Sequence, residues 1–310
     1  MNNEVNSPAQ AGFRAGVLGD VGAVAAASRA LAAGAVVGVG FANFYALTAR
    51  ADEGTVRGVN LLKGRPVSQV GSIAVPPAGI LDLWDLDRLP TGLNSHSARE
   101  IVDAFYNLGP FGFRGPARDG LPSHLTSDDN GTTTTQVIAP GYACPSNAFL
   151  QGCLTATGDE FLYITSANRS RHLTGADDSP AHWRAEGLQA EFGDQPGFCL
   201  LAHDDEDAAR QRYPNHLTMS TTVLALHGTS YIPGDRRPHL SLDRHGSLHV
   251  DTVRAVLADL GFGLLLDPRA TPRLTLRGYE SGLGDPSPTG PTSPVQGRRA
   301  EKRANLGNRG

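Results

Sequence analysis

The stretch YITSANRSR (residues 163–171) ends an apolar, strand-like run with four small polar side chains, Thr165, Ser166, Asn168 and Ser170. Such side chains can hydrogen-bond the neighbouring backbone and form a turn. They can also surround a phosphate, with backbone N–H groups filling the gaps. Taken alone, the stretch favours the plain turn, so the rest of the chain has to decide between the two interpretations.

The composition is that of a globular protein with few charges. The chain has 310 residues, 40% hydrophobic and 19% charged, which suits one large domain or two small ones. Its net charge of -4 gives no overall basic field for nucleic acid. Cys144, Cys153 and Cys199 show no CxxC spacing, which argues against a disulfide framework or a zinc site and fits a reducing compartment.

The start of the chain lacks the pattern of a secretion signal, and its apolar stretch lacks the pattern of a membrane span. Residues 1–10 have no basic segment followed by an apolar run, and ALAAGAVVGVGFA (residues 30–42) is too short and glycine-rich to span a bilayer. We therefore expect a cytoplasmic protein without membrane association.

Helix-like and strand-like segments alternate, which indicates an α/β domain. The expected helices cover residues 21–34, 52–64, 97–109, 144–158, 181–193 and 251–262, with Asp52 and Ser97 as N-terminal caps. The expected strands cover residues 35–49, with a turn near Gly40, and 70–77, 132–140, 160–168 and 221–228. We expect a flexible leader at 1–12, one domain over 13–277, and a disordered Gly- and Pro-rich basic tail at 278–310.

Lysine is almost absent from the chain. Lys63 and Lys302 are the two lysines among 27 Lys and Arg residues, which leaves 27 − 2 = 25 arginines. Lys302 lies in the expected tail, so Lys63 is the one lysine of the expected domain. Because an ammonium and a guanidinium are not equivalent at a phosphate or a reacting carbonyl, we interpret Lys63 as retained for a site.

Several motifs follow one another in a fixed order. GAVVGVGFANFYALTA (34–49) is followed by LLKGRPVSQVGSIAV (61–75), ITSANRS (164–170), MSTTVLAL (219–226) and LDRHGSLHV (242–250). Over residues 15–262 this order resembles the YrdC family of threonylcarbamoyl-adenylate synthases. That family carries Lys-x-Arg-Pro, a Thr-Ser-Ala-Asn-x-Ser-Gly turn, a Ser-Thr-Ile/Val pair and a late Arg-x-Gly.

The resemblance implies an α/β fold in which a twisted mixed sheet with flanking helices surrounds a concave, positive groove. It implies a nucleotidyltransferase that binds ATP with Mg²⁺. A carbamate made from bicarbonate and L-threonine attacks the α-phosphate, releases pyrophosphate and leaves a carbamoyl-adenylate, as used in tRNA processing. It implies catalytic roles for Lys63 and Arg65, and the ATP-binding residues it implies are Lys63, Arg65, Thr165, Ser166, Asn168, Ser220 and Arg244.

The chain departs from the family pattern on the amino-acid side. Phe41 and Asn43 stand in the segment where the family has Pro-Thr-Asp/Glu-Thr-x-Tyr-Gly-Leu. TTTTQVIAPGYACP (132–145) replaces the Val-Arg-x-Pro strand and contains no arginine. We therefore expect a small acceptor other than L-threonine, either a less polar amino acid or an amine. The candidate substrate-binding residues are Asn43, Tyr45, Gln136 and Ser170.

Two alternatives stay open at this point. The chain could be a carbamoyltransferase-type domain that uses carbamoyl-adenylate made elsewhere, or a non-catalytic nucleotide- or RNA-binding protein with the same fold. The acidic net charge disfavours RNA. AHDDEDAAR (202–210) is interpreted as the solvated start of a helix rather than a metal site, and His172, His182 and His216 as structural.

Overall fold

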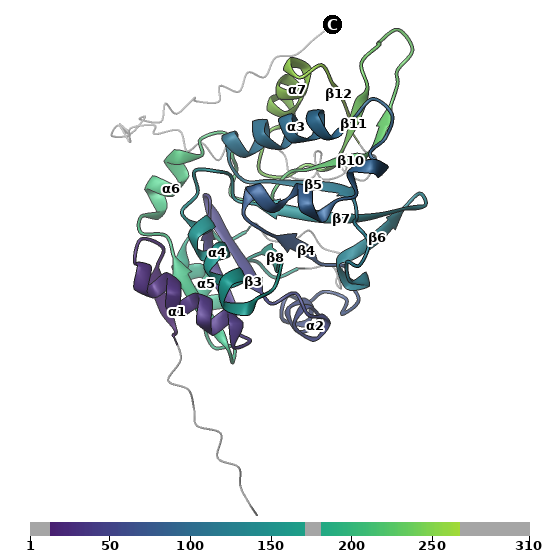
Figure 1. Ribbon diagram of the computed structural model, residues 1–310. Helices are drawn as coiled ribbons and strands as arrows, with labels where there is room; N and C mark the ends of the chain where they lie inside the picture. Colours follow the sequence, from purple (N-terminus) through teal and green to yellow (C-terminus); the bar gives the residue numbers. More distant parts are fainter. Residues whose placement is uncertain (1–12, 171–180, 267–310) are drawn as a thin grey trace, which may run out of the picture.

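Twelve strands form one mixed sheet in the computed structural model, which describes residues 13–170 and 181–266 (Figure 1). The expected leader at 1–12, the expected tail at 278–310 and His172 lie outside the described residues. The strands are β1 (Ala15–Val17), β2 (Val36–Phe41), β3 (Phe44–Ala49), β4 (Ser72–Ala74), β5 (Phe111–Pro116), β6 (Thr126–Asp129), β7 (Thr132–Ala139), β8 (Leu162–Ser166), β9 (Phe198–Ala202), β10 (Val223–Ser230), β11 (His239–Arg244) and β12 (Gly263–Leu266). The α-helices are α1 (Val21–Ala32), α2 (Glu53–Leu62), α3 (Ser95–Leu108), α4 (Ser146–Thr157), α5 (Ala185–Phe192), α6 (Glu206–Arg212) and α7 (Val250–Asp259).

The sheet mixes parallel and antiparallel neighbours, which confirms the predicted α/β class. Its order is β1-β9-β2-β3-β8-β4-β7-β5-β10-β11-β12, and β6 pairs with β7 outside this path. Pairs such as β2 with β9 and β4 with β7 are parallel, whereas β2 with β3 and β5 with β7 are antiparallel. Segments far apart in the sequence therefore lie side by side at the centre of the sheet.

The two faces of the sheet are covered by different helices. Ala27 and Leu31 of α1 and Phe149 and Leu150 of α4 belong to one core cluster. Residues of α2, α3, α5 and α7 belong to the other core cluster. Figure 1 shows α1 beside α4 at one end of the molecule and α3 beside α7 at the other. Because side chains alternate along a strand, the central strands β3, β4, β7 and β8 contribute to both clusters.

Capping residues fix where the helices begin. Asp52 caps α2 as predicted, since its carboxylate accepts a hydrogen bond from the backbone N–H of Thr55 at 2.9 Å. The predicted cap of α3 is wrong. Asn94 caps that helix and accepts from the backbone N–H of Ser97 at 2.9 Å, so the helix begins two residues earlier than the pattern indicated.

The hairpin of β2 and β3 turns at Ala42 and Asn43 rather than near Gly40. Phe41 pairs with Phe44, so two residues make the turn, and Ala42 has a φ of 58°. Packing explains why position 40 of β2 is a glycine. A Cβ there would lie 2.7 Å from the His203 ring, so no larger residue fits.

Six of the twelve strands of the sheet were not predicted: β1, β5, β6, β9, β11 and β12. The sequence of β5, FGFRGP, contains glycines and a proline, which are typical of loops when no neighbouring strand is known. Here β5 is held between β7 and β10, and these tertiary contacts override the local preference.

The hairpin turn is fastened to the segment that precedes β10. The Asn43 side chain donates from Nδ2 to the His216 carbonyl at 2.7 Å, and the backbone N–H of Ala42 donates to Cys144 Sγ at 3.3 Å. The His216 ring packs edge-on to Tyr213 at 6.1 Å between centroids. Neither ring nitrogen of this buried histidine has a hydrogen-bond partner within the described residues.

The buried His216 makes the stability of the fold sensitive to mild acid. Burial lowers its pKa to about 4, whereas a histidine in an unfolded chain titrates near about 6.5. The unfolded state therefore binds the proton more readily between these values, and stability falls as the pH falls through that window. The loss from His216 amounts to about 3 kcal/mol.

We expect His216→Phe to flatten the dependence of the unfolding free energy on pH between about pH 4 and 6.5. Chemical unfolding at several pH values measures this slope. A smaller slope should remain, because burial also lowers the pKa of His203. The matched control is His96→Gln on the exposed face of α3, which should keep the wild-type slope. Equal slopes for His216→Phe and the wild type would contradict the assignment.

Candidate functional site

A cavity of about 310 Å³ lies over the central strands of the sheet. Its apolar lining is Phe41, Phe44, Ala46, Val70, Ile138 and Ile164, most of which also belong to the core under α1 and α4. Its polar lining is Arg65, Gln69, Ser72, Arg114, Gln136, Tyr163, Thr165, Ser166, Ser220, Thr221, Asp243 and Arg244. Three arginines face one aspartate among these residues, so the lining favours anionic ligands.

Arg65 reaches the cavity from the loop after α2. The guanidinium donates from Nη1 to Thr165 Oγ1 at 2.8 Å, which joins this loop to the exit of β8. Gly64 precedes Arg65 with a φ of 72°, a conformation that glycine adopts without strain. The reversal at Gly64 lets Lys63 and Arg65, two residues apart, point into different surroundings.

Lys63 lies behind the cavity wall and does not line the cavity. The side chain is 0% exposed, and its ammonium donates to the carbonyl oxygens of Ser166 and Asn168, the latter at 2.6 Å. The carbonyl of Lys63 accepts from the backbone N–H of Ser170 at 2.7 Å. These bonds tie the end of α2 to the turn after β8. The resemblance implied that Lys63 contacts the ligand directly. In the structure, Lys63 contacts the turn and does not line the cavity.

The turn after β8 combines both interpretations of its sequence. Asn168 is buried and accepts from Ser166 Oγ at 2.6 Å, and its Nδ2 donates to the Arg169 carbonyl at 3.1 Å. Asn168 and Ser170 therefore build the turn without lining the cavity. Thr165 and Ser166 do line the cavity, so the two polar residues nearest the strand are the ones available to a ligand.

Ser220 and Arg244 also line the cavity. Ser220 Oγ donates to Ser166 Oγ at 3.3 Å. Arg244, at the end of β11, donates to the Thr221 carbonyl at 2.8 Å and to Thr221 Oγ1 at 2.9 Å. The structure thus brings Arg65, Thr165, Ser166, Ser220 and Arg244 together around one cavity, as the resemblance implied.

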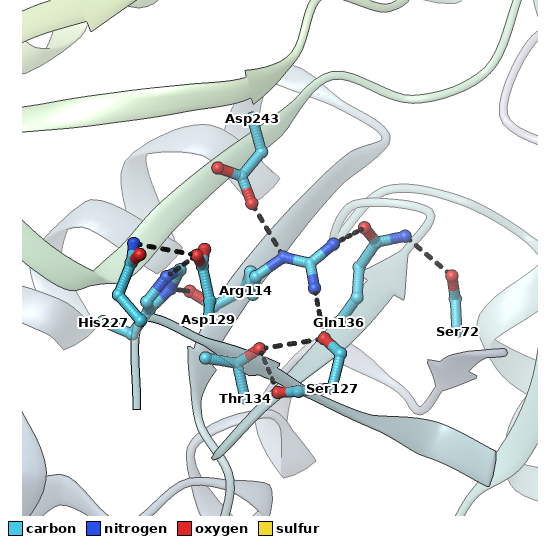
Figure 2. A network of polar contacts seen from close by, with 9 residues as sticks. Ser72, Arg114, Ser127, Asp129, Thr134, Gln136, His227 and Asp243 are labelled. Atoms are coloured by element: carbon cyan, nitrogen blue, oxygen red, sulfur yellow. Dashed lines mark hydrogen bonds and ion pairs between the residues drawn. The ribbon is translucent and has the colours of Figure 1, made fainter. Parts of the chain in front are cut away.

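Arg114 of β5 was not anticipated. Figure 2 shows its guanidinium at the centre of a polar network, with Nε donating to Asp243 Oδ2 at 2.7 Å and Nη2 donating to Gln136 Oε1 at 3.2 Å. The sequence FGFRGP could have revealed this residue. In a strand, Phe111 and Phe113 share one face and Arg114 lies on the other.

The cation of this part of the cavity therefore comes from β5 rather than β7. Val137, Ile138, Ala139 and Pro140 stand where the family has Val-Arg-x-Pro, so Ile138 occupies the place of the arginine. Ile138 and Gln136 both line the cavity, and no arginine belongs to β7, as expected from the sequence.

Besides Ser170, two further proposed substrate-binding residues do not reach the cavity. Tyr45 points to the other face of the sheet, where its hydroxyl donates to Glu206 Oε1 at 2.8 Å and burial raises its pKa. Phe44 and Ala46, its neighbours along β3, line the cavity instead, as the alternation of a strand requires. Asn43 is used in the hairpin turn, bound to the His216 carbonyl.

The acidic run is a helix start, as predicted. Asp205 caps α6 and accepts from the backbone N–H of Asp207 and Ala208, while Glu206 pairs with Arg184 at 3.1 Å. Across residues 13–170 and 181–266, no three His, Cys, Asp or Glu side chains are grouped as metal ligands. In the same part of the chain, each helix is too short or too polar to traverse a bilayer.

Lys63 and Arg65 form a matched pair for testing which one carries the local fold. Lys63→Met keeps the volume but removes the ammonium that donates to the Ser166 and Asn168 carbonyls, so we expect it to lower the free energy of unfolding by about 3 kcal/mol. Arg65→Met removes a cavity-facing cation and should lower it by no more than about 1 kcal/mol. Urea unfolding of both variants measures the difference. Equal stabilities would show that the Lys63 contacts do not hold the turn.

Comparison with solved structures identifies the fold. The crystal structure of P. abyssi Sua5 complexed with L-threonine matches with a TM-score of 0.53 and 18% identity, over 77% of this chain and 58% of that one. A double-alanine variant of P. abyssi Sua5 matches with a TM-score of 0.54 and 18% identity, over 79% and 58%. The hypothetical protein smu.1377c from Streptococcus mutans UA159 matches with a TM-score of 0.52 and 14% identity, over 78% and 94%.

This chain therefore spans 58% of the length of Sua5. No protein-family model matches the sequence, and a comparison with curated proteins gives no significant match. At identities of 14 to 18%, the likeness establishes the fold and leaves the activity to be argued from the site. The resemblance to the YrdC family is confirmed at this level, and the chain has the fold of the Sua5/YrdC family.

Proposed function

We propose that this chain binds ATP in the cavity and forms a carbamoyl-adenylate from bicarbonate and a small amino-acid or amine acceptor, with release of pyrophosphate. The observation that supports this most is that Arg65 and Arg244 line one cavity, together with the hydroxyls of Thr165 and Ser166. The fold that it shares with Sua5, which was crystallised with L-threonine, supports an amino acid or related acceptor.

The residue types suit the transfer of an adenylyl group. A carbamate oxygen attacks the α-phosphate of ATP, the bond from that phosphorus to the bridging oxygen breaks, and pyrophosphate leaves with the electron pair. Negative charge develops on the phosphate oxygens, and positioned cations and donors lower the barrier. Arg65 and Arg244 both line the cavity and supply planar sets of N–H donors. Lys63 acts as a positioning residue through the turn that carries Thr165.

Magnesium enters this proposal with the nucleotide. Asp243 is the one carboxylate of the cavity lining, and it already accepts from Arg114 at 2.7 Å. Mg²⁺ is commonly held by one or two carboxylates together with substrate phosphates and water. The described residues fit an ion bound mainly through the phosphates, where it would neutralise charge on the leaving pyrophosphate.

The acceptor side of the cavity disfavours a polar side chain. Phe41 and Ile138 line the cavity at places where the family pattern has a hydroxyl residue and an arginine. A site discriminates strongly for a hydroxyl when its own polar groups are left unpaired by the wrong ligand. Since Phe41 and Ile138 have no such groups, we infer that L-threonine is a poor acceptor and that a less polar amino acid or amine is preferred.

The test is pyrophosphate release from magnesium-ATP and bicarbonate with a panel of acceptors, with the adenylate detected by mass spectrometry. We expect turnover that needs bicarbonate, with L-isoleucine or L-valine faster than L-threonine. Arg65→Ala should lower the rate about a hundredfold or more, since it removes a cation at the phosphates.

Three outcomes would count against the proposal in different ways. Turnover with L-threonine at about 1 per second or faster would overturn the inference about the acceptor. If no acceptor in the panel gives pyrophosphate release, the proposed adenylation of these acceptors is overturned. Failure to release pyrophosphate while added carbamoyl-adenylate is consumed would favour a carbamoyltransferase-type domain.

A further inference from the structure

A chain of hydrogen bonds crosses four strands and ends in the cavity (Figure 2). Arg114 donates from Nε to Asp243 Oδ2 at 2.7 Å and from Nη2 to Gln136 Oε1 at 3.2 Å. Gln136 in turn donates from Nε2 to Ser72 Oγ at 2.7 Å. The four residues belong to β11, β5, β7 and β4, so the chain runs across the sheet rather than along one strand.

The direction of every bond in this chain is fixed by Arg114. A guanidinium can only donate hydrogen bonds, so the Gln136 amide must turn its oxygen toward Arg114. The amide nitrogen then faces Ser72, and the Ser72 oxygen has to accept. A flipped amide would place two sets of N–H groups against each other. The assignment of the Gln136 oxygen and nitrogen therefore follows from chemistry.

Ser72 is left with a hydroxyl hydrogen to donate. Its oxygen accepts from Gln136, and within the described residues no acceptor for the hydroxyl hydrogen is found. Ser72 lines the cavity, at the first residue of β4. The chain of donors therefore ends in a hydroxyl whose free hydrogen is available to a ligand, and each bond of such a chain strengthens the next.

The position of Ser72 places this donor between two arginine-bound groups. On one side Ser72 pairs with Ile164 of β8, the residue before Thr165, which binds Arg65. On the other side it binds Gln136, which binds Arg114. The Arg114 charge is itself matched by Asp243, whose side chain is 8% exposed, so Arg114 is better suited to orienting Gln136 than to binding an anion directly.

We propose that Ser72 is an oriented hydrogen-bond donor for an anionic oxygen of the ligand, and that Gln136 and Arg114 are positioning residues that fix the direction of its hydroxyl. The anionic oxygen is a carboxylate of the acceptor or a phosphate of the nucleotide. The inference rests on the proposed function only in requiring that an anionic ligand enters the cavity.

The test is a double-mutant cycle with Ser72→Ala, Gln136→Met and the double variant. Calorimetry measures binding of magnesium-ATP and inorganic pyrophosphate as phosphate probes, and of L-isoleucine and L-threonine as carboxylate probes. A hydrogen bond to a charged group is worth enough that Ser72→Ala should weaken one class of probe about tenfold or more. The class that weakens identifies the oxygen that Ser72 binds.

The cycle separates positioning from direct contact. If Gln136 acts through Ser72, Gln136→Met weakens binding on its own but adds nothing to Ser72→Ala. Ser68→Ala is the matched control, because Ser68 is an exposed serine of the loop before β4 and does not line the cavity. It should keep the wild-type affinity. Thermal unfolding checks that each variant is folded, and Ser72→Cys, a weak donor of similar size, replaces Ser72→Ala if that variant is not.

Wild-type affinity for both classes of probe in Ser72→Ala would overturn the inference while leaving the proposed function intact. Fully additive losses in the double variant would overturn the positioning role of Gln136. If the wild-type protein binds neither class of probe, the proposed function fails together with the inference. The wild-type measurement alone distinguishes this outcome from a failure of the Ser72 inference.

Discussion

The buried ammonium of Lys63 is the constraint on which the site depends. A charge without solvent requires several acceptors, and here the carbonyls of Ser166 and Asn168 supply them. Meeting that requirement fixes the turn after β8 against the end of α2. The same arrangement brings Arg65 within 2.8 Å of Thr165. One charged group out of reach of the cavity thereby holds in place residues that face it.

This contact explains why a lysine stands at position 63 in a chain that otherwise uses arginine. Lys63 stands in a chain where 25 of the 27 Lys and Arg residues are arginine, since 27 − 2 = 25. A compact ammonium can donate to oxygens that converge on one point, whereas a planar guanidinium spreads its donors over a fork. The scarcity of lysine predicted a ligand site at Lys63, whereas the structure shows this side chain bound to the backbone. The reason for the lysine lies in the turn, because its acceptors are backbone oxygens of the protein.

Local signals predicted the helices, whereas six of the twelve strands were missed, and long-range contacts account for the strand β5. The cap at Asp52 and the polar exit of β8 are coded within a few residues, so the sequence located them. The strand β5 exists because β7 and β10 flank it, and no local pattern reports that. The site divides in the same way: motif residues that line the cavity were identified, whereas Tyr45 was placed on the wrong face and Arg114 was overlooked.

Moving a cation from one strand to its neighbour changes what it can do. An arginine at the place of Ile138 would stand in β7, whereas Arg114 stands one strand further across the sheet and meets Asp243. A guanidinium paired with a carboxylate offers little net charge to a second carboxylate, because the two anions compete for the same donors. Arg114 still fixes the orientation of the Gln136 amide, because it donates to Gln136 Oε1. The donor that we propose for this cavity is therefore an oriented hydroxyl, and it can share the lining with the apolar side chain of Phe41 because a hydroxyl is far cheaper to desolvate than a free cation.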